Sequence, residues 1–134
     1  MDKNELIKLA IEARKLSYSS YSNFAVGAAL LCKDGKVFLG SNIENASYSL
    51  GLCAERNALY NALMNGYKKE DFVSLAVVAD TDEVCSPCGA CRQVLSELLD
   101  ENAPIYMANL KGEQKETTVK ELLPFAFGGK DLNK

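Results

Sequence analysis

The chain has 134 residues, 48% of them hydrophobic and 25% charged, with a formal net charge of −3. This length suits one hydrophobic core and is too short for two ordinary domains, so we expect a single domain over residues 1–134. An acidic chain with scattered lysines argues against a nucleic-acid-binding surface, which normally needs a clustered basic face.

The apolar runs are too short to cross a membrane; the longest covers residues 24–32 and is broken at Gly27. The N-terminus is polar and does not resemble a secretory signal. We therefore expect a cytoplasmic protein. In that compartment five cysteines are metal ligands or thiols rather than disulfides.

The pattern of apolar and turn residues predicts helices and strands in the order α-β-β-α-β-α-β-β-α. In chain order they cover about residues 2–17, 24–32, 36–42, 53–65, 72–80, 88–99, 105–110, 115–118 and 118–123. Strands that alternate with helices favour a layered α/β fold. The sequence thus predicts a three-layer α-β-α sandwich with a five-stranded mixed sheet.

Local signals mark several of these elements. Asp2 with Glu5 has the spacing of a helix capping box, and Asp34-Gly35 between two apolar runs is suited to a tight hairpin turn. Residues 72–80 are nearly all apolar, as expected of a strand buried on both faces. The second helix is expected to bury one side, formed by Ala54, Ala58, Leu59, Ala62 and Leu63.

Two cysteine motifs begin predicted helices in a chain that contains no histidine. Cys53 opens the second helix, and Cys88 and Cys91 open the third as Pro-Cys-Gly-Ala-Cys. Helix starts favour thiolates, and both starts follow strand ends, where ligand crevices form in sheets of this kind. A catalytic zinc takes three protein ligands and keeps one position for water. The sequence predicts one zinc ion per chain, held by these three residues.

Two charged residues beside Cys53 have candidate roles. Glu55 matches the glutamate that acts as general acid and base in zinc deaminases, where it is not a ligand. We expect Glu55 to take a proton from water that the zinc activates. Zinc with three thiolates carries a formal charge of −1, and Arg56 could offset it by donating hydrogen bonds to ligand sulfurs. An ordinary solvated helix arginine is the other interpretation of Arg56.

These motifs resemble those of cytidine deaminases, in particular the small, homotetrameric, three-cysteine type that acts on free nucleosides. The resemblance extends over nearly the whole chain. It covers Ser19–Ser22, Phe24–Ala29, Asn42–Tyr48, Cys53–Arg56, Ser86–Gln93 and Leu122–Phe127. It implies zinc-dependent hydrolytic deamination of cytidine and deoxycytidine to uridine and deoxyuridine, with release of ammonia, in pyrimidine salvage.

The resemblance also implies which residues bind the substrate. Asn42 and Glu44 would hydrogen-bond the ribose hydroxyls, and Phe24 would pack against the nucleoside. The backbone N–H of Ala54 would bind the base carbonyl, and the carbonyl of Ser86 would receive the amino group.

Two further residues, Tyr48 and Phe127, would come from neighbouring subunits of a homotetramer, so that each pocket is shared. A carboxylate at the sugar end, Glu44, favours neutral hydroxyls, and the chain has no phosphate-binding glycine loop. We therefore expect cytidine and deoxycytidine to be preferred over CMP.

Cys85 leaves a different metal arrangement open. Its spacing to Cys88 and Cys91 repeats a chelating pattern, and with Cys53 it could form a closed four-cysteine module holding structural zinc or an iron–sulfur cluster. An iron–sulfur run would continue with Cys-Pro three residues later, which this chain lacks. A closed site would also leave Glu55 without a purpose.

Other classes share parts of the pattern. Cys88-x-x-Cys91 could be a thioredoxin-like redox motif, but that reading does not explain Glu55. Blasticidin-type deaminases share the zinc motifs, and here Glu44 favours a ribose-bearing substrate. Polynucleotide deaminases typically have histidine in place of Cys53 and need a basic groove.

Overall fold

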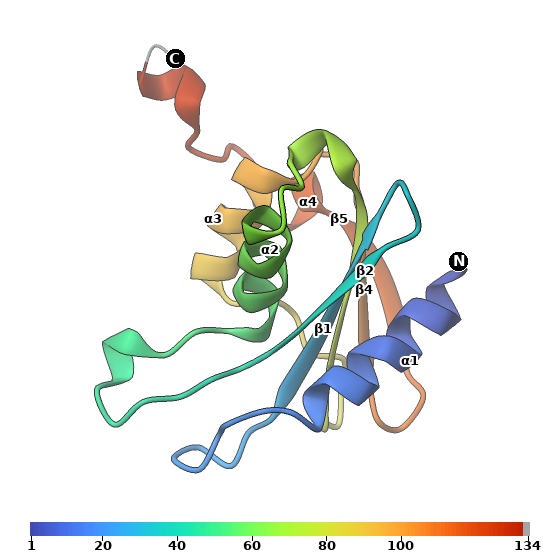
Figure 1. Ribbon diagram of the computed structural model, residues 1–134, viewed down its shortest axis with the longest axis vertical. Helices are drawn as coiled ribbons and strands as arrows, with labels where there is room; N and C mark the ends of the chain where they lie inside the picture. Colours follow the sequence, from blue (N-terminus) through green and yellow to red (C-terminus); the bar gives the residue numbers. More distant parts are fainter. Residues whose placement is uncertain (133–134) are drawn as a thin grey trace.

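Helices cover both faces of one five-stranded sheet in the computed structural model, which describes residues 1–132 (Figure 1). The helices are α1 (Lys3–Arg14), α2 (Ala54–Met64), α3 (Gly89–Leu98) and α4 (Val119–Leu122), and the strands are β1 (Val26–Cys32), β2 (Val37–Ser41), β3 (Phe72–Ala79), β4 (Pro104–Asn109) and β5 (Gln114–Thr118). The predicted order and α/β class are confirmed. Short 3₁₀ turns at 48–50, 69–71 and 129–132 were not predicted.

The sheet has the strand order β2-β1-β3-β4-β5 and is mixed. β1 is antiparallel to both β2 and β3, β3 is parallel to β4, and β4 is antiparallel to β5. β2 and β3 therefore point the same way, and their carboxyl ends lie at the same edge of the sheet. Because α2 follows β2 and α3 follows β3, both helices begin at that edge.

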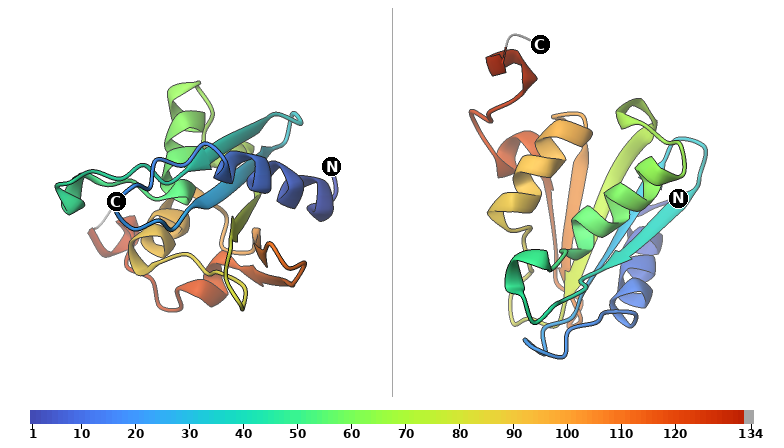
Figure 2. Two further views of the ribbon diagram at one scale, coloured as in Figure 1. Left: turned by 90° about the horizontal axis from the view of Figure 1, so that it is seen from below. Right: turned by 60° about the vertical axis from the view of Figure 1, so that its left-hand side comes forward.

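Two buried clusters fill the spaces on either side of the sheet. α1 packs its buried residues, including Leu6 and Ala10, onto β1 and β3. The larger cluster lies on the other face, where α2 contributes Leu59 and α3 contributes Leu95. Figure 1 shows α1 on the opposite side of the sheet from α2 and α3, and the right-hand view of Figure 2 shows α2 and α3 side by side.

The capping and turn signals act as the sequence predicts. The Asp2 carboxylate accepts a hydrogen bond from the Glu5 backbone N–H at 2.9 Å, and Gly35 has a φ of 90° in the hairpin turn. The first helix ends at Arg14, not at Ser17, because the following N–H groups bond to carbonyls three residues back. Within residues 1–132, none of the helices is both long and apolar enough to cross a membrane.

The placement of Leu63 on the buried side of α2 was wrong. Leu63 is 37% exposed, whereas Leu59 and Ala62 are fully buried. Successive residues on a helix are rotated by about 100°, so Leu63 falls at the edge of the stripe that faces the sheet.

Gly40 lets the first turns of α2 lie directly on β2. A Cβ at this position would lie 2.3 Å from the Ala54 carbonyl oxygen and 2.4 Å from the Ala58 backbone nitrogen. Both are backbone atoms, so neither can move aside cheaply. The absence of a side chain at Gly40 therefore sets the height at which the start of α2 sits above the sheet.

Candidate metal centre

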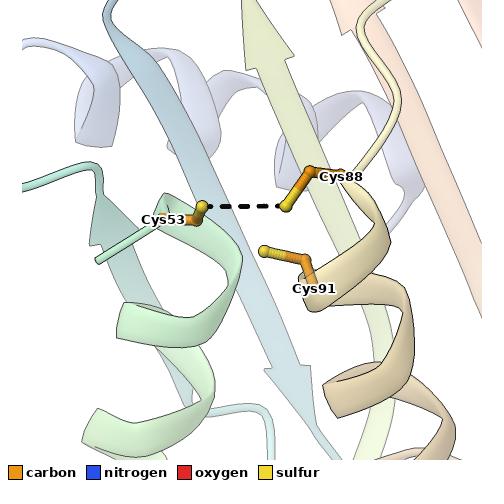
Figure 3. Close-up of side chains that lie close together, drawn as sticks. All are labelled: Cys53, Cys88 and Cys91. Carbon is orange, nitrogen blue, oxygen red and sulfur yellow. Dashed lines mark hydrogen bonds between the residues drawn. The ribbon is translucent and has the colours of Figure 1, made fainter. Parts of the chain in front are cut away.

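Three cysteine sulfurs meet where α2 and α3 begin (Figure 3). Cys53 is the N-cap of α2, Cys88 is the N-cap of α3, and Cys91 lies in the first turn of α3. Their Sγ atoms all lie within 4.8 Å of one another, and those of Cys53 and Cys88 are 3.9 Å apart. A tetrahedral zinc with Zn–S bonds of about 2.3 Å needs sulfurs about 3.8 Å apart. The three thiols thus match zinc in donor type, number and spacing.

Access to this cluster is uneven. Cys91 is buried, Cys53 is half-buried and Cys88 is exposed, so the cluster has one side towards solvent. Cys85 does not belong to the group; its Sγ lies 3.8 Å from the carbonyl oxygen of Ser86. The geometry therefore favours a three-cysteine site over the closed four-cysteine module. Cys32, in β1, is 2% exposed, and burial raises its pKa to about 11.

Hydrogen bonds stabilise a thiolate at Cys53. The pKa of Cys53 is lowered to about 5. The largest cause is a hydrogen bond with the Cys91 thiol, and the Arg56 guanidinium lowers the pKa further. Arg56 Nη2 donates to Cys53 Sγ at 3.3 Å. A cation in this place reduces the negative charge that three thiolates bring together.

Glu55 lies in the first turn of α2, two residues after Cys53, and is only 4% exposed. Burial among the surrounding protein atoms raises the pKa of its carboxyl to about 7. A carboxyl with a pKa near neutrality can both accept and give up a proton at physiological pH. The structure thus places a buried carboxyl with a raised pKa beside the sulfurs of Cys53 and Cys91.

The side chain of Asn42, directly after β2, is held by three hydrogen bonds. Its side-chain oxygen accepts from Ser17 Oγ at 2.6 Å and from the Val26 backbone N–H at 2.9 Å. Its amide nitrogen donates to the Phe24 carbonyl at 2.7 Å. One N–H of the amide is left over, so Asn42 can offer a ligand one oriented donor.

Glu44 is anchored to the same polar loop. One carboxylate oxygen accepts from the backbone N–H groups of Tyr21 at 3.1 Å and Ser22 at 3.0 Å, and the other accepts from the Ser22 hydroxyl. These hydrogen bonds lower the pKa of Glu44, and the bond from the Ser22 hydroxyl has the largest effect. Glu44 is therefore a fixed anion. That Ser17 and Ser22 hold Asn42 and Glu44 could not be predicted, because these contacts span more than twenty residues.

A short backbone ladder connects this polar end to the metal end. Ile43, between Asn42 and Glu44, exchanges backbone hydrogen bonds with Leu52 at 2.9 Å in both directions. Leu52 directly precedes Cys53. The positions of the two ends relative to each other are thus set by the main chain.

The other candidate residues lie at the surface or at the helix starts. Glu44 and Tyr48 line one hollow of about 430 Å³, while Phe127 lines a separate groove beside α3 and α4. Phe24, Tyr48 and Phe127 are 42%, 82% and 57% exposed. Ala54 is the first residue of α2, and Ser86 lies in the loop that leads to Cys88. The single chain does not bring Phe127 to the hollow that Glu44 lines.

The fold and this site define a zinc enzyme of the deaminase class. A family model described as the cytidine and deoxycytidylate deaminase zinc-binding region matches residues 1–107. The chain is 55% identical over 133 residues to a cytidine deaminase of Halalkalibacterium halodurans, with 99% of both chains covered. It is 50% identical to one of Sporosarcina psychrophila, covering 99% of this chain and 96% of the other. The chain belongs to the cytidine deaminase family.

Solved structures agree with this assignment. A crystal structure of cytidine deaminase from Burkholderia pseudomallei superposes with a TM-score of 0.93 at 49% identity. The match covers 95% of this chain and 100% of that chain. One from Mycobacterium tuberculosis gives a TM-score of 0.82 at 39% identity, covering 96% and 98%. The predicted fold class, the family resemblance and the zinc cofactor are confirmed.

Proposed function

We propose that this chain catalyses the hydrolytic deamination of cytidine and deoxycytidine to uridine and deoxyuridine, with release of ammonia. The observation that carries the proposal is the buried carboxyl of Glu55 beside three sulfurs that leave one side of the cluster accessible. Bound by these sulfurs, zinc would supply a Lewis acid that activates water. The relatives named cytidine deaminase support the choice of substrate.

Glu55 moves the protons in this reaction. It takes one proton from the attacking water and delivers it to the pyrimidine ring, and it then takes the second proton of that oxygen and delivers it to the leaving amine. The backbone N–H of Ala54, at the start of α2, binds the base carbonyl, and the carbonyl of Ser86 receives the amino group. Both groups belong to segments that also carry metal ligands, so the base is oriented by the same backbone that holds the zinc. Arg56 donates to the Cys53 sulfur and offsets the excess negative charge.

The sugar lies at the other end of the Ile43–Leu52 ladder. Asn42 offers one N–H and Glu44 accepts hydrogen bonds, which together suit a hydroxyl group. Phe24, whose carbonyl already holds the Asn42 amide, packs against the nucleoside. A fixed carboxylate at this end repels a phosphate.

Cytidine should therefore be turned over at least about 100-fold more efficiently, by kcat/KM, than CMP, because like charges placed together cost several kcal/mol. The measurement is uridine or UMP formation by chromatography, with ammonia release measured in parallel. Glu44→Gln is the matched variant: it should weaken cytidine binding and narrow the gap between the two substrates. Turnover of CMP at a rate comparable to cytidine would refute this assignment of the sugar end.

We also propose that the enzyme is a homotetramer whose pockets are shared, with Tyr48 and Phe127 reaching into neighbouring sites. Two observations support this. Both side chains are largely exposed in the single chain, and the C-terminal segment extends away from the body of the protein (Figure 1).

A cytoplasmic location fits the five free cysteines, three of which must stay reduced to bind metal.

Shared pockets can be tested by mixing two impaired chains. Phe127→Ala alone should lower activity about tenfold, and Glu55→Gln alone should be almost inactive. Co-expressed chains should regain activity, because about a quarter of the pockets would combine an intact Glu55 with an intact Phe127 from a neighbour. If the mixture shows only the average of the two separate activities, each pocket is built by one chain.

A further inference from the structure

Arg92, in α3, binds two separate segments, the loop at residues 86–87 and the end of α4, through one guanidinium group. Its Nε donates to the Pro87 carbonyl at 2.7 Å, and its Nη2 donates to the Ser86 hydroxyl at 3.0 Å. Its Nη1 donates to the Leu122 carbonyl at 3.1 Å, at the end of α4. Ser86 and Pro87 lead directly into the metal ligand Cys88. The Arg92 side chain thus ties the loop that leads to Cys88 to the end of α4.

The segment that Arg92 holds has no regular secondary structure. Residues 81–88 form neither helix nor strand, and Cys88 is the most exposed of the three sulfur ligands. Its neighbour Pro87, by contrast, is fully buried, so the backbone is pinned one residue before the ligand. A ligand on an irregular loop keeps its position only if the loop is fixed by contacts of this kind.

The arrangement requires the shape of arginine as well as its charge. A guanidinium is planar and presents five donors in a rigid fork, so three acceptors in three directions can be satisfied at once. A lysine ammonium at the same place could not reach all three acceptors from one position. The part-buried surroundings strengthen the bonds to the Pro87 and Leu122 carbonyls, because water competes for them less well than at the surface.

We propose that Arg92 is a positioning residue that keeps Cys88 in register with Cys53 and Cys91, and that it thereby sets how long the enzyme retains its zinc. The proposal deepens the proposed function, since it concerns the same metal site. It assigns Arg92 no contact with the substrate. Loss of the fork should loosen the loop and speed the release of zinc from a folded protein.

Gln93 provides a matched control on the next residue of α3. Its Nε2 donates to the Phe127 carbonyl at 2.9 Å, so it also ties α3 to the C-terminal segment. It does not, however, contact the loop that carries Cys88. Comparing the two positions separates an effect on the metal loop from a general weakening of the contact between α3 and the C-terminus.

The experiment follows zinc transfer from the purified, zinc-loaded enzyme to a chromogenic chelator, with Tm measured on the same samples. Arg92→Gln and Arg92→Lys should both release zinc about 10- to 100-fold faster than the unaltered chain. Ser86→Ala, which removes one of the three bonds, should give a smaller increase. Gln93→Ala should release zinc at the unaltered rate.

Three results would overturn the proposal. Equal release rates in Arg92→Gln and Gln93→Ala would make Arg92 an ordinary structural residue. Zinc release from Arg92→Lys at the rate of the unaltered chain would mean that a positive charge, without the guanidinium fork, is sufficient to hold the loop. Should Arg92→Gln fail to fold, Ser86→Ala decides, and unchanged release in that variant would count against the proposal. Because no nucleoside is present, these outcomes do not depend on which substrate the enzyme takes.

Discussion

Replacing Glu55 with glutamine is expected to lower kcat for cytidine by about 10⁴-fold, at the upper end of general acid–base effects, because in the proposed mechanism this one carboxyl performs every proton transfer. The amide has the same shape but can neither take nor deliver a proton. Zinc content should stay at one ion per chain, because Glu55 is not among the three sulfur ligands. The measurements are initial rates of uridine formation and metal analysis of the same samples.

Stability gives a second readout for the same variant. Burial raises the pKa of Glu55, which means that the folded protein disfavours its charged form. A neutral amide removes that cost, so Tm should not fall. Glu97→Gln, the same change at an exposed position of α3, should leave kcat unaltered. If Glu55→Gln lost its zinc together with its activity, Glu55 would be part of the metal cage and not the proton carrier.

Replacing Cys91 with alanine should abolish both metal binding and turnover. Cys91 is fully buried and supplies one of three sulfurs, and the remaining two cannot form a catalytic zinc site. Zinc content after dialysis should fall below about a tenth of an ion per chain, and Tm should drop because bound metal stabilises the folded state. Metal analysis and thermal unfolding check both effects.

Cys85 supplies the control for that prediction. It lies three residues before Cys88 but outside the sulfur group, with its Sγ beside the Ser86 carbonyl. Cys85→Ser should therefore remain colourless and keep one zinc ion and its full activity. Loss of metal in Cys85→Ser would revive the closed four-cysteine module.

The order of elements and the metal ligands could be predicted because each depends on residues close together in sequence. Apolar periodicity and the Asp2 and Gly35 signals are local, and they place the strands and helices correctly. Cys88 and Cys91 are three residues apart at a helix start, so they face the same way. Cys53 joins them because β2 and β3 are parallel in direction, which the alternation of elements already favours.

The Arg56–Cys53 bond was among the expected contacts, but the long-range contacts that hold the site in place could not be predicted. Ser17 reaches Asn42, Ser22 reaches Glu44, and Arg92 reaches Leu122 across more than twenty residues in each case. No spacing rule connects such pairs, because they depend on how loops settle over the finished sheet. The misplacement of Leu63 has a related cause: helical periodicity gives the direction of the buried stripe but not its width.

The bare backbone at Gly40 has a consequence for motion during turnover. With the Ala54 carbonyl and the Ala58 nitrogen pressed against it, there is no slack for α2 to slide or tilt on the sheet. A nucleoside therefore meets a reaction centre that is already assembled. Any movement that admits a nucleoside is therefore expected in the exposed loop that carries Tyr48 and not at the start of α2.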